Sequence, residues 1–354
     1  MKIAVGMSGG VDSSVAAHLL KEEGHEVVGV TLKLWGGLSD QGCCSVSDVE
    51  DARYVANKLG IEHHVWGFTE EFSQYVVDPY VYSHSIGETP NPCIECNKKL
   101  KFDAMISRAL RLEFDAIATG HYAIKFTDKN GKFRLRRSVD RRKDQSYVLS
   151  GIKPAALEYC MFPLGSLHKE EVRKIANSLG FITAEKPDSQ DICFILATGG
   201  REQFLKDRIE FHSAKVIDDE TEEVIGEVRS LEMITVGQRR FLGEKGDGRI
   251  RYALKVDNES RSVRVGPIEK LMDNFIELRQ TFFYDVTPKP GDKVRVQTSA
   301  HGDPKEAVWL GESRIELLEP IRRVAVGQTV AIYDGEDGED VLGSGMVSKC
   351  DKSL

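Results

Sequence analysis

The chain has 354 residues, of which 41% are hydrophobic, and it carries a formal net charge of −8. A chain of this length usually forms two or three domains, and this hydrophobic content is enough for packed cores. The sequence contains no run of about 18 apolar residues, which a membrane helix needs, and it does not start with an apolar leader segment. We therefore expect neither a membrane span nor a signal peptide. The expected compartment is the cytosol, where the seven cysteines stay reduced and are candidates for chemistry or metal binding.

The first half of the chain alternates strand-like with helix-like segments. An alternating order of this kind predicts a parallel sheet with helices on both faces, the α/β doubly wound fold. We expect strands at residues 2–5, 25–35, 62–68 and 114–123, and helices at 15–23, from a capping box of Ser47 and Glu50 to Leu59, from about Thr69, and at 98–113.

The second half reads as short strands and turns. Residues 213–228 and 251–266 each predict a hairpin, the latter turning at Asp257 and Asn258, and further strands follow from Val286. We therefore expect three domains, namely a catalytic domain at 1–205, a small β-rich domain at 206–273 and a C-terminal β-barrel at 274–354.

A glycine-rich loop, SGGVDSS at residues 8–14, follows the first expected strand. Glycines let backbone N–H groups approach an anion, and a helix N-terminus adds positive potential and donors. The same letters also suit a plain strand-to-helix turn in which Asp12 or Ser13 caps the helix. The loop is neither a Walker A motif nor a dinucleotide fingerprint. It is similar to the SGGxDS loop of PP-loop ATP pyrophosphatases, which implies cleavage of ATP between its α and β phosphates.

Three cysteines lie in segments that suggest chemistry. Cys93 and Cys96 form a C-x-x-C just before the expected basic helix, and Cys193 follows far downstream in KPDSQDICF. A helix N-terminus and neighbouring lysines lower the pKa of a thiol, which favours reactivity at Cys96. Cys193 also suits a small buried core position, whereas a C-x-x-C on a loop is rarely only packing.

These motifs together resemble those of the tRNA-specific 2-thiouridylases, the MnmA/TrmU family. The resemblance implies ATP- and Mg²⁺-dependent 2-thiolation of the wobble uridine of tRNA through an adenylated uridine. It implies tRNA as one partner and a sulfur donor protein or hydrosulfide as another. The matching stretches run through the chain in order as GMSGGVDSS, Cys43-Cys44-Ser45 with DARYVA, TPNPCIECNKKLKF, ATGHYA, KDQSYVL, FPLG, KPDSQDICF, VGQRR and AVGQTVAIYDG with LGSG.

The resemblance also implies roles for single residues. Cys96 and Cys193 are the implied catalytic pair: a persulfide on Cys193 attacks the uridine C2, and Cys96 then forms a disulfide with Cys193. The implied ATP-binding residues are Gly6, Met7, Ser8, Gly9, Gly10, Val11, Asp12, Ser13, Leu32 and Gly120. The implied tRNA-binding residues are Asn91, Pro92, Cys93, His121, Lys143, Asp144, Gln145 and Gln328.

Three positions depart from the family pattern. Cys93 stands where many members carry Asp, Ser299-Ala300 replaces an Arg-Tyr pair of the barrel, and a His-x-Gly is missing around residues 227–230. The extra thiol makes Cys93, Cys96 and Cys193 candidates to hold a [4Fe–4S] cluster with one open iron that binds hydrosulfide. The same thiols suit Zn²⁺ with a water, or a plain thiol pair that follows the persulfide route.

Two other classes of protein stay open, a PP-loop synthetase with another substrate and a non-catalytic RNA-binding or iron–sulfur module. The synthetases have no use for the two catalytic cysteines, and a binding module has no use for an intact ATP loop. A basic run at residues 132–143, with seven basic residues and one acid, predicts either a patch for tRNA phosphates or a solvated hairpin face.

Overall fold

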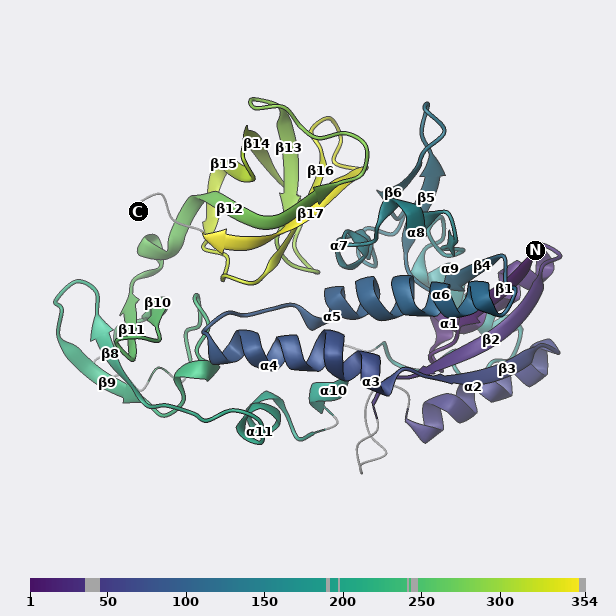
Figure 1. Cartoon of the computed structure of the whole chain (residues 1–354), viewed down its shortest axis with the longest axis horizontal. Coiled ribbons are helices and arrows are strands. Elements are labelled where there is room, and N and C mark those ends of the chain that lie inside the picture. The colour runs from purple at the N-terminus through teal and green to yellow at the C-terminus, as the bar shows by residue number, and fades with distance from the viewer. Residues whose placement is uncertain (36–44, 189–191, 197, 241, 243–247, 350–354) are drawn as a thin grey trace. The chain divides into compact units, whose positions relative to one another are not determined.

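The computed structural model describes residues 1–35, 45–188, 192–196, 198–240, 242 and 248–349. Cys43 and Cys44 lie outside these residues. The chain forms two compact units (Figure 1), of which the first comprises Met1–Val77, Pro92–Arg201 and Glu339–Val341 and the second Asp78–Asn91, Glu202–Gly338 and Leu342–Leu354. The division into three domains at 205/206 and 273/274 stays a prediction.

The first unit is built on a parallel sheet, which confirms the predicted α/β fold. Its strand order is β3 (Glu62–Gly67), β2 (Glu26–Lys33), β1 (Lys2–Gly6), β4 (Ala116–Thr119) and β7 (Cys160–Met161), and neighbouring strands pair in parallel. The central strand β1 is buried along its middle, as expected for a strand covered on both faces.

Helices cover both faces of this sheet. Residues of α1 (Val11–Glu22), α2 (Val46–Leu59) and α9 (Lys169–Ser178) share one apolar core with Ile3 and Val5 of β1. On the opposite face, the Met105 side chain of α6 (Met105–Arg111) lies against Gly6. A two-stranded hairpin of β5 (Ala123–Thr127) and β6 (Phe133–Arg137) follows β4.

Three predicted helix starts were wrong in detail. Helix α1 begins at Val11 rather than at residue 15. Helix α2 is capped by Ser45, whose side chain accepts from the Asp48 backbone, so the capping box is Ser45 and Asp48 rather than Ser47 and Glu50. The helix expected at 98–113 instead begins with α5 (Pro92–Glu95) and continues as a π-helix (Cys96–Ala104) into α6. The remaining α- and π-helices of the described residues are α3 (Thr69–Phe72), a π-helix (Ser73–Val77), α4 (Asp78–Ser85), α7 (Ser146–Leu149), α8 (Pro154–Leu157), α10 (Cys193–Leu196) and α11 (Arg201–Lys206). Two short 3-10 helices lie at Leu231–Met233 and Ile268–Leu271.

The second unit is β-rich and holds both predicted hairpins. They join in one four-stranded sheet of order β10 (Tyr252–Asp257), β11 (Ser262–Gly266), β8 (Ala214–Asp218) and β9 (Val224–Val228), with β11 parallel to β8. The predicted barrel is closed in the order β12 (Met272–Phe283), β15 (Arg314–Arg322), β14 (Lys305–Gly311), β13 (Lys293–Gln297), β16 (Thr329–Asp334) and β17 (Val341–Lys349).

No helix among the described residues combines the length and the apolar character that a membrane crossing requires.

Candidate active site

The loop between β1 and α1 lies where the strand order of the parallel sheet reverses. β2 and β3 lie on one side of β1, and β4 and β7 lie on the other. Open α/β sheets bind their ligands at such a switch point, outside the carboxyl ends of the strands. Gly10 is the N-cap of α1, and within the described residues no side chain caps this helix. The first N–H groups of α1 are therefore positioned to bind an anion such as phosphate.

The first glycine of the loop, Gly9, is required by its backbone. Gly9 has φ = 72°, and a Cβ at this position would collide with the carbonyl oxygen of Asp48 in α2. The serines divide between two roles. Ser8 is exposed, whereas Ser13 is buried and donates through its hydroxyl to the Gly10 carbonyl at 3.2 Å. Of these two serines only Ser8 is exposed, and its hydroxyl lies 3.4 Å from that of Ser13, which shapes the loop.

Gly120 and Leu32 are two further residues that the sequence assigns to ATP binding, and only Gly120 has a close approach to this loop in the structure. Gly120 follows β4, and a Cβ there would lie 2.6 Å from the backbone nitrogen of Ser13. Leu32 is buried in β2. In the same strand, the Thr31 hydroxyl donates to the Met7 carbonyl at 2.7 Å, which fixes the start of the loop.

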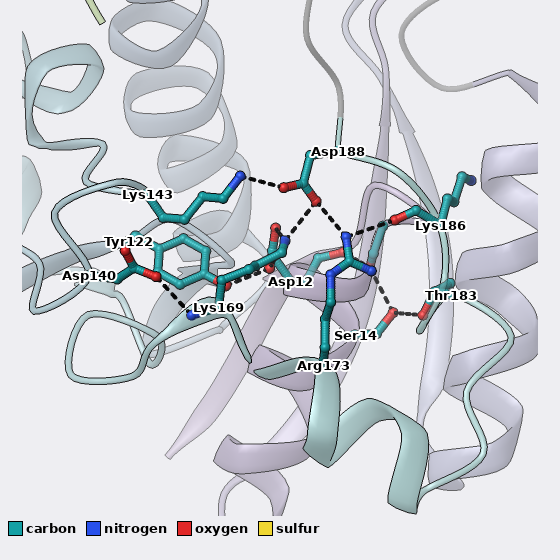
Figure 2. Close-up of polar contacts among 12 residues, drawn as sticks. Asp12, Ser14, Tyr122, Asp140, Lys143, Lys169, Arg173, Thr183, Lys186 and Asp188 are labelled. Carbon is teal, nitrogen blue, oxygen red and sulfur yellow. Dashed lines mark hydrogen bonds and ion pairs between the residues drawn. The ribbon is translucent and has the colours of Figure 1, made fainter. Parts of the chain in front are cut away.

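Asp12 of the loop belongs to an ionic cluster that the sequence did not predict (Figure 2). The Asp12 carboxylate accepts hydrogen bonds from the Tyr122 hydroxyl at 2.7 Å and from Lys169 Nζ at 2.7 and 2.8 Å. Lys169 Nζ also lies 2.8 Å from Asp188. Burial, with the adjacent Asp12 charge, holds the pKa of Tyr122 well above its ordinary value, so its hydroxyl remains a donor.

Asp188 is the centre of this cluster. It pairs with Lys143 at 2.7 Å, with Lys169 at 2.8 Å and with Arg173 at 3.2 Å. Burial alone would raise the pKa of the Asp188 carboxyl, but the hydrogen bonds from Lys143 and Lys169 outweigh it and lower that pKa below its ordinary value. Asp188 is therefore ionised at neutral pH and binds three cations.

The three candidate cysteines lie at helix starts in the first unit. Cys93 is exposed in α5, Cys96 begins the π-helix, and Cys193 begins α10; both of the latter are partly exposed. Short π-helical segments occur frequently at functional sites. By contrast, Cys160 of β7 is buried, and burial raises the pKa of its thiol to about 12. Accessibility therefore separates the candidate thiols from Cys160.

The predicted metal site is not formed in this structure. Among the described residues, which include all three candidate cysteines, no group of three or more His, Cys, Asp or Glu side chains could hold a metal ion. A [4Fe–4S] cluster or Zn²⁺ requires thiolates gathered around one point. The donor set therefore does not fit either group as arranged.

Several residues expected to bind tRNA make contacts inside the protein. Asp144 accepts from Arg137 at 2.9 Å, and Gln145 accepts through its side chain from the Tyr122 backbone at 2.9 Å. His121 is buried 2.8 Å from the Thr119 hydroxyl, and burial lowers the pKa of its imidazole well below the ordinary value. In the second unit, Gln328 donates to the Thr89 carbonyl at 2.6 Å, and Asn91 ends the segment that precedes Pro92 and Cys93.

The basic run at residues 132–143 lies on and after the hairpin β5–β6, and most of its charges are paired. Arg136 pairs with Asp340 at 2.5 Å, Arg137 with Asp144 and Arg141 with Glu339. Arg134 lies 3.9 Å from Asp128, and Lys143 pairs with Asp188. Arg142 is exposed, and its guanidinium forms no ion pair with a described residue. The run therefore offers fewer cations to a ligand than its sequence suggests.

Comparisons with known proteins agree with this arrangement. A family model described as "tRNA methyl transferase HUP domain" matches residues 1–197, and one described as "Aminomethyltransferase beta-barrel domain" matches residues 283–347. The tRNA-specific 2-thiouridylase MnmA of Corynebacterium kroppenstedtii is 42% identical over 99% of this chain and 95% of its own length. The MnmA of Mycolicibacterium smegmatis is 43% identical over 99% of this chain and 100% of its own length.

Solved structures resemble the chain only weakly. A 4-thiouridine synthetase–RNA complex with bound ATP is 18% identical, with a TM-score of 0.35, over 58% of this chain and 50% of that chain. A likeness this low adds nothing to the assignment. The curated relatives, by contrast, match along nearly the whole chain at more than 40% identity. This chain therefore belongs to the MnmA family of tRNA-specific 2-thiouridylases.

Proposed function

We propose that this protein uses ATP to activate the 2-carbonyl oxygen of the wobble uridine of tRNA and replaces that oxygen with sulfur. The observation that carries the proposal is the SGGVDSS loop, set at the switch point of a unit that also contains Cys96 and Cys193. The relatives that match the chain over nearly its full length are named tRNA-specific 2-thiouridylases. A synthetase that shares only the loop has no use for two partly exposed thiols.

In the first step, the uridine O2 attacks the α-phosphorus of ATP and pyrophosphate leaves with the bonding electrons. The N–H groups at the start of α1 and the exposed Ser8 hydroxyl are the groups that bind the phosphates. Mg²⁺ is expected to arrive on the triphosphate, because it keeps several waters and needs few protein ligands. The carboxylate of Asp12, in the same loop, accepts hydrogen bonds from Tyr122 and Lys169.

In the second step, the terminal sulfur of a persulfide on Cys193 attacks the uridine C2, and AMP leaves. The Cys96 thiolate then attacks the Cys193 sulfur, which breaks the bond to the transferred sulfur and forms a Cys96–Cys193 disulfide. A donor protein supplies the persulfide sulfur. A dithiol reductant of the cytosol supplies the two electrons that reset the pair.

The residues proposed to meet tRNA divide into two groups. Asn91, Pro92 and Cys93 precede the catalytic Cys96 along the chain and are the proposed contacts to the target base. Lys143, Asp144, Gln145 and His121 of the first unit, and separately Gln328 of the second, are the other proposed tRNA contacts. Their bonds inside the protein, given above, favour a role in fixing loops over direct phosphate binding.

An iron–sulfur route remains the alternative, and the replacement of the family's Asp by Cys93 is its only support. Anaerobic purification followed by iron and sulfide analysis tests it. A colourless, iron-free protein that thiolates tRNA from a persulfide donor would exclude the cluster. Iron bound by the wild type and lost in Cys93→Ala, together with activity, would favour it.

The product test decides the ATP chemistry. With ATP, Mg²⁺, tRNA and a persulfide donor, the purified protein is expected to release AMP and pyrophosphate and to form 2-thiouridine. Release of ADP and phosphate would contradict the assignment of the loop.

Single cysteine variants separate the two steps. Cys193→Ala is expected to abolish 2-thiouridine formation while ATP–pyrophosphate chemistry persists, because the thiol acts after activation. Cys96→Ala is expected to stop turnover as well. Cys160→Ala is the matched control, since its thiol is buried and protonated, and it should retain thiolation. Near-normal thiolation in Cys193→Ala would rule out the persulfide role.

A further inference from the structure

Cys96 lies in the chain between two buried side chains. Ile94 is 3% exposed and Asn97 is 4% exposed, whereas Cys93 at the start of the same segment is exposed. The Asn97 side chain donates from Nδ2 to the backbone carbonyl of Val148 at 3.3 Å. The residue that follows the candidate thiol is therefore attached to helix α7.

A second contact joins the same two segments of the chain. A Cβ placed on Gly151, which follows the end of α7, would lie 3.5 Å from Cγ2 of Ile94 and 3.6 Å from Cδ of Lys98. These distances are ordinary van der Waals contacts, so the backbone at Gly151 lies next to side chains on both sides of Cys96.

Helix α7 is itself attached to the ATP loop, residues 8–14. Its N-cap residue Gln145 donates from the backbone N–H to the Tyr122 carbonyl at 2.8 Å, and the Tyr122 backbone N–H donates to the Gln145 side chain at 2.9 Å. The Tyr122 hydroxyl in turn donates to Asp12 of the loop at 2.7 Å (Figure 2). A continuous series of contacts therefore runs from the ATP loop through α7 to Asn97.

The Asn97 amide supplies a bond that α7 cannot make within itself. Val148 lies in the last turn of this short helix, where carbonyl groups lack partners inside the helix. The Oδ1 atom of Asn97 is buried and has no hydrogen-bond partner among the described residues. A leucine of similar size would therefore keep the packing and remove the donor to the Val148 carbonyl.

We propose that Asn97 is a positioning residue for Cys96. Through its bond to α7 it holds the start of the π-helix, and with it the Cys96 thiol, at a fixed place relative to the ATP loop. This inference rests on the proposed function, because it assigns Asn97 to the step in which Cys96 attacks the sulfur of Cys193. Asp12 keeps its bonds to Tyr122 without Asn97, so activation of the uridine by ATP continues.

The first test measures the reactivity of the thiols and needs no tRNA. The rates at which a small neutral alkylating reagent modifies Cys96 and Cys193 are followed by mass analysis, at a pH at which both thiols are ionised. In Asn97→Leu the ratio of Cys96 to Cys193 modification is expected to rise several-fold, because the start of the π-helix is no longer held. Asn57→Leu is the matched control, since Asn57 is exposed on α2, and it should keep the wild-type ratio.

The second test measures the sulfur-transfer step in a single turnover. With persulfide-loaded protein, ATP and tRNA, Asn97→Leu is expected to form the Cys96–Cys193 disulfide about tenfold to a hundredfold more slowly than the wild type, as for a misplaced reacting group. The rate of pyrophosphate release should stay nearly unchanged. Asn97→Gln keeps the amide on a side chain one methylene longer, and it is expected to recover part of the loss.

The outcomes separate this inference from the proposed function. An unchanged alkylation ratio in Asn97→Leu, or equal increases at both cysteines, overturns the positioning role. If Asn97→Leu does not fold, Asn97→Gln decides: a smaller rise in the ratio is expected, and an unchanged ratio overturns the role. A wild-type protein that forms no 2-thiouridine overturns the proposed function, and the alkylation ratio still decides whether Asn97 holds Cys96.

Discussion

The absence of a side chain at Gly120 leaves room for the first turn of α1 at the glycine-rich loop. A Cβ at this position would lie 2.6 Å from the Ser13 nitrogen and 2.7 Å from the Asp12 carbonyl carbon, so Gly120→Ala must displace the first turn of α1. The N–H groups that we propose to bind phosphate shift with that turn, and we expect the KM for ATP to rise about tenfold or more.

The matched control is Gly67→Ala, since a Cβ at the end of β3 meets nothing within 4 Å and Gly67 has no left-handed φ. Steady-state pyrophosphate release at varied ATP concentration measures the effect. Equal KM values for the two variants would show that Gly120 does not support the ATP loop.

The position of the glycine-rich loop between a strand and a helix could be predicted because its residues are contiguous in sequence, whereas the ionic cluster around Asp12 could not. Lys169 and Asp12, which share a hydrogen bond, are 157 residues apart in the chain. Nothing in the sequence around Lys169 marks its role, which its burial and its ion pairs with Asp12 and Asp188 reveal. The sequence did hold one sign of the cluster, the two charged residues Lys186 and Asp188 of the KPDSQDICF motif. We had assigned the role of that motif to Cys193 alone.

At the scale of elements, helix α2 is capped by Ser45 and not by Ser47, the residue that the sequence suggested. Ser45 accepts from the Asp48 backbone and Asp48 accepts from the Ser45 backbone, so Ser45→Ala should destabilise this helix by about 1 kcal/mol. Ser47→Ala, the control, should cost much less. Hydrogen exchange of the α2 amides measures the difference, and a larger effect at Ser47 would contradict the assigned cap.

Strand β12 was missed from the sequence because its pattern is interrupted. Its pairing with β15 shifts between Asp273 and Phe275, and its pairing with β17 shifts between Arg279 and Phe282, around Gln280 with φ = 51°. Such bulges break the alternation of buried and exposed residues on which a strand prediction depends. The π-helix at Cys96 was invisible for a similar reason, since the sequence pattern specifies a helix and not its hydrogen-bond register.

At the scale of the whole molecule, the charge balance limits how tRNA can be bound. The chain has a net charge of −8, so its attraction to phosphate must come from local cations. Ion pairs within the protein already engage Arg136, Arg137 and Arg141 of the basic run. Neutralising them would disturb these pairs as well as any contact to tRNA, so the exposed Arg142 is the informative position.

The salt dependence of tRNA binding therefore distinguishes a phosphate contact from a structural charge. If Arg142 contacts a phosphate, Arg142→Gln should lower the slope of log affinity against log salt by about 0.7 to 0.9, because one fewer counterion is released. Arg137→Gln removes the same charge from a side chain that is 13% exposed and paired with Asp144, so it should leave the slope unchanged while loosening the loop. Filter binding from low to moderate salt measures both slopes. Equal slopes for Arg142→Gln and the wild type would mean that this residue lies on a solvated face and that tRNA is bound elsewhere.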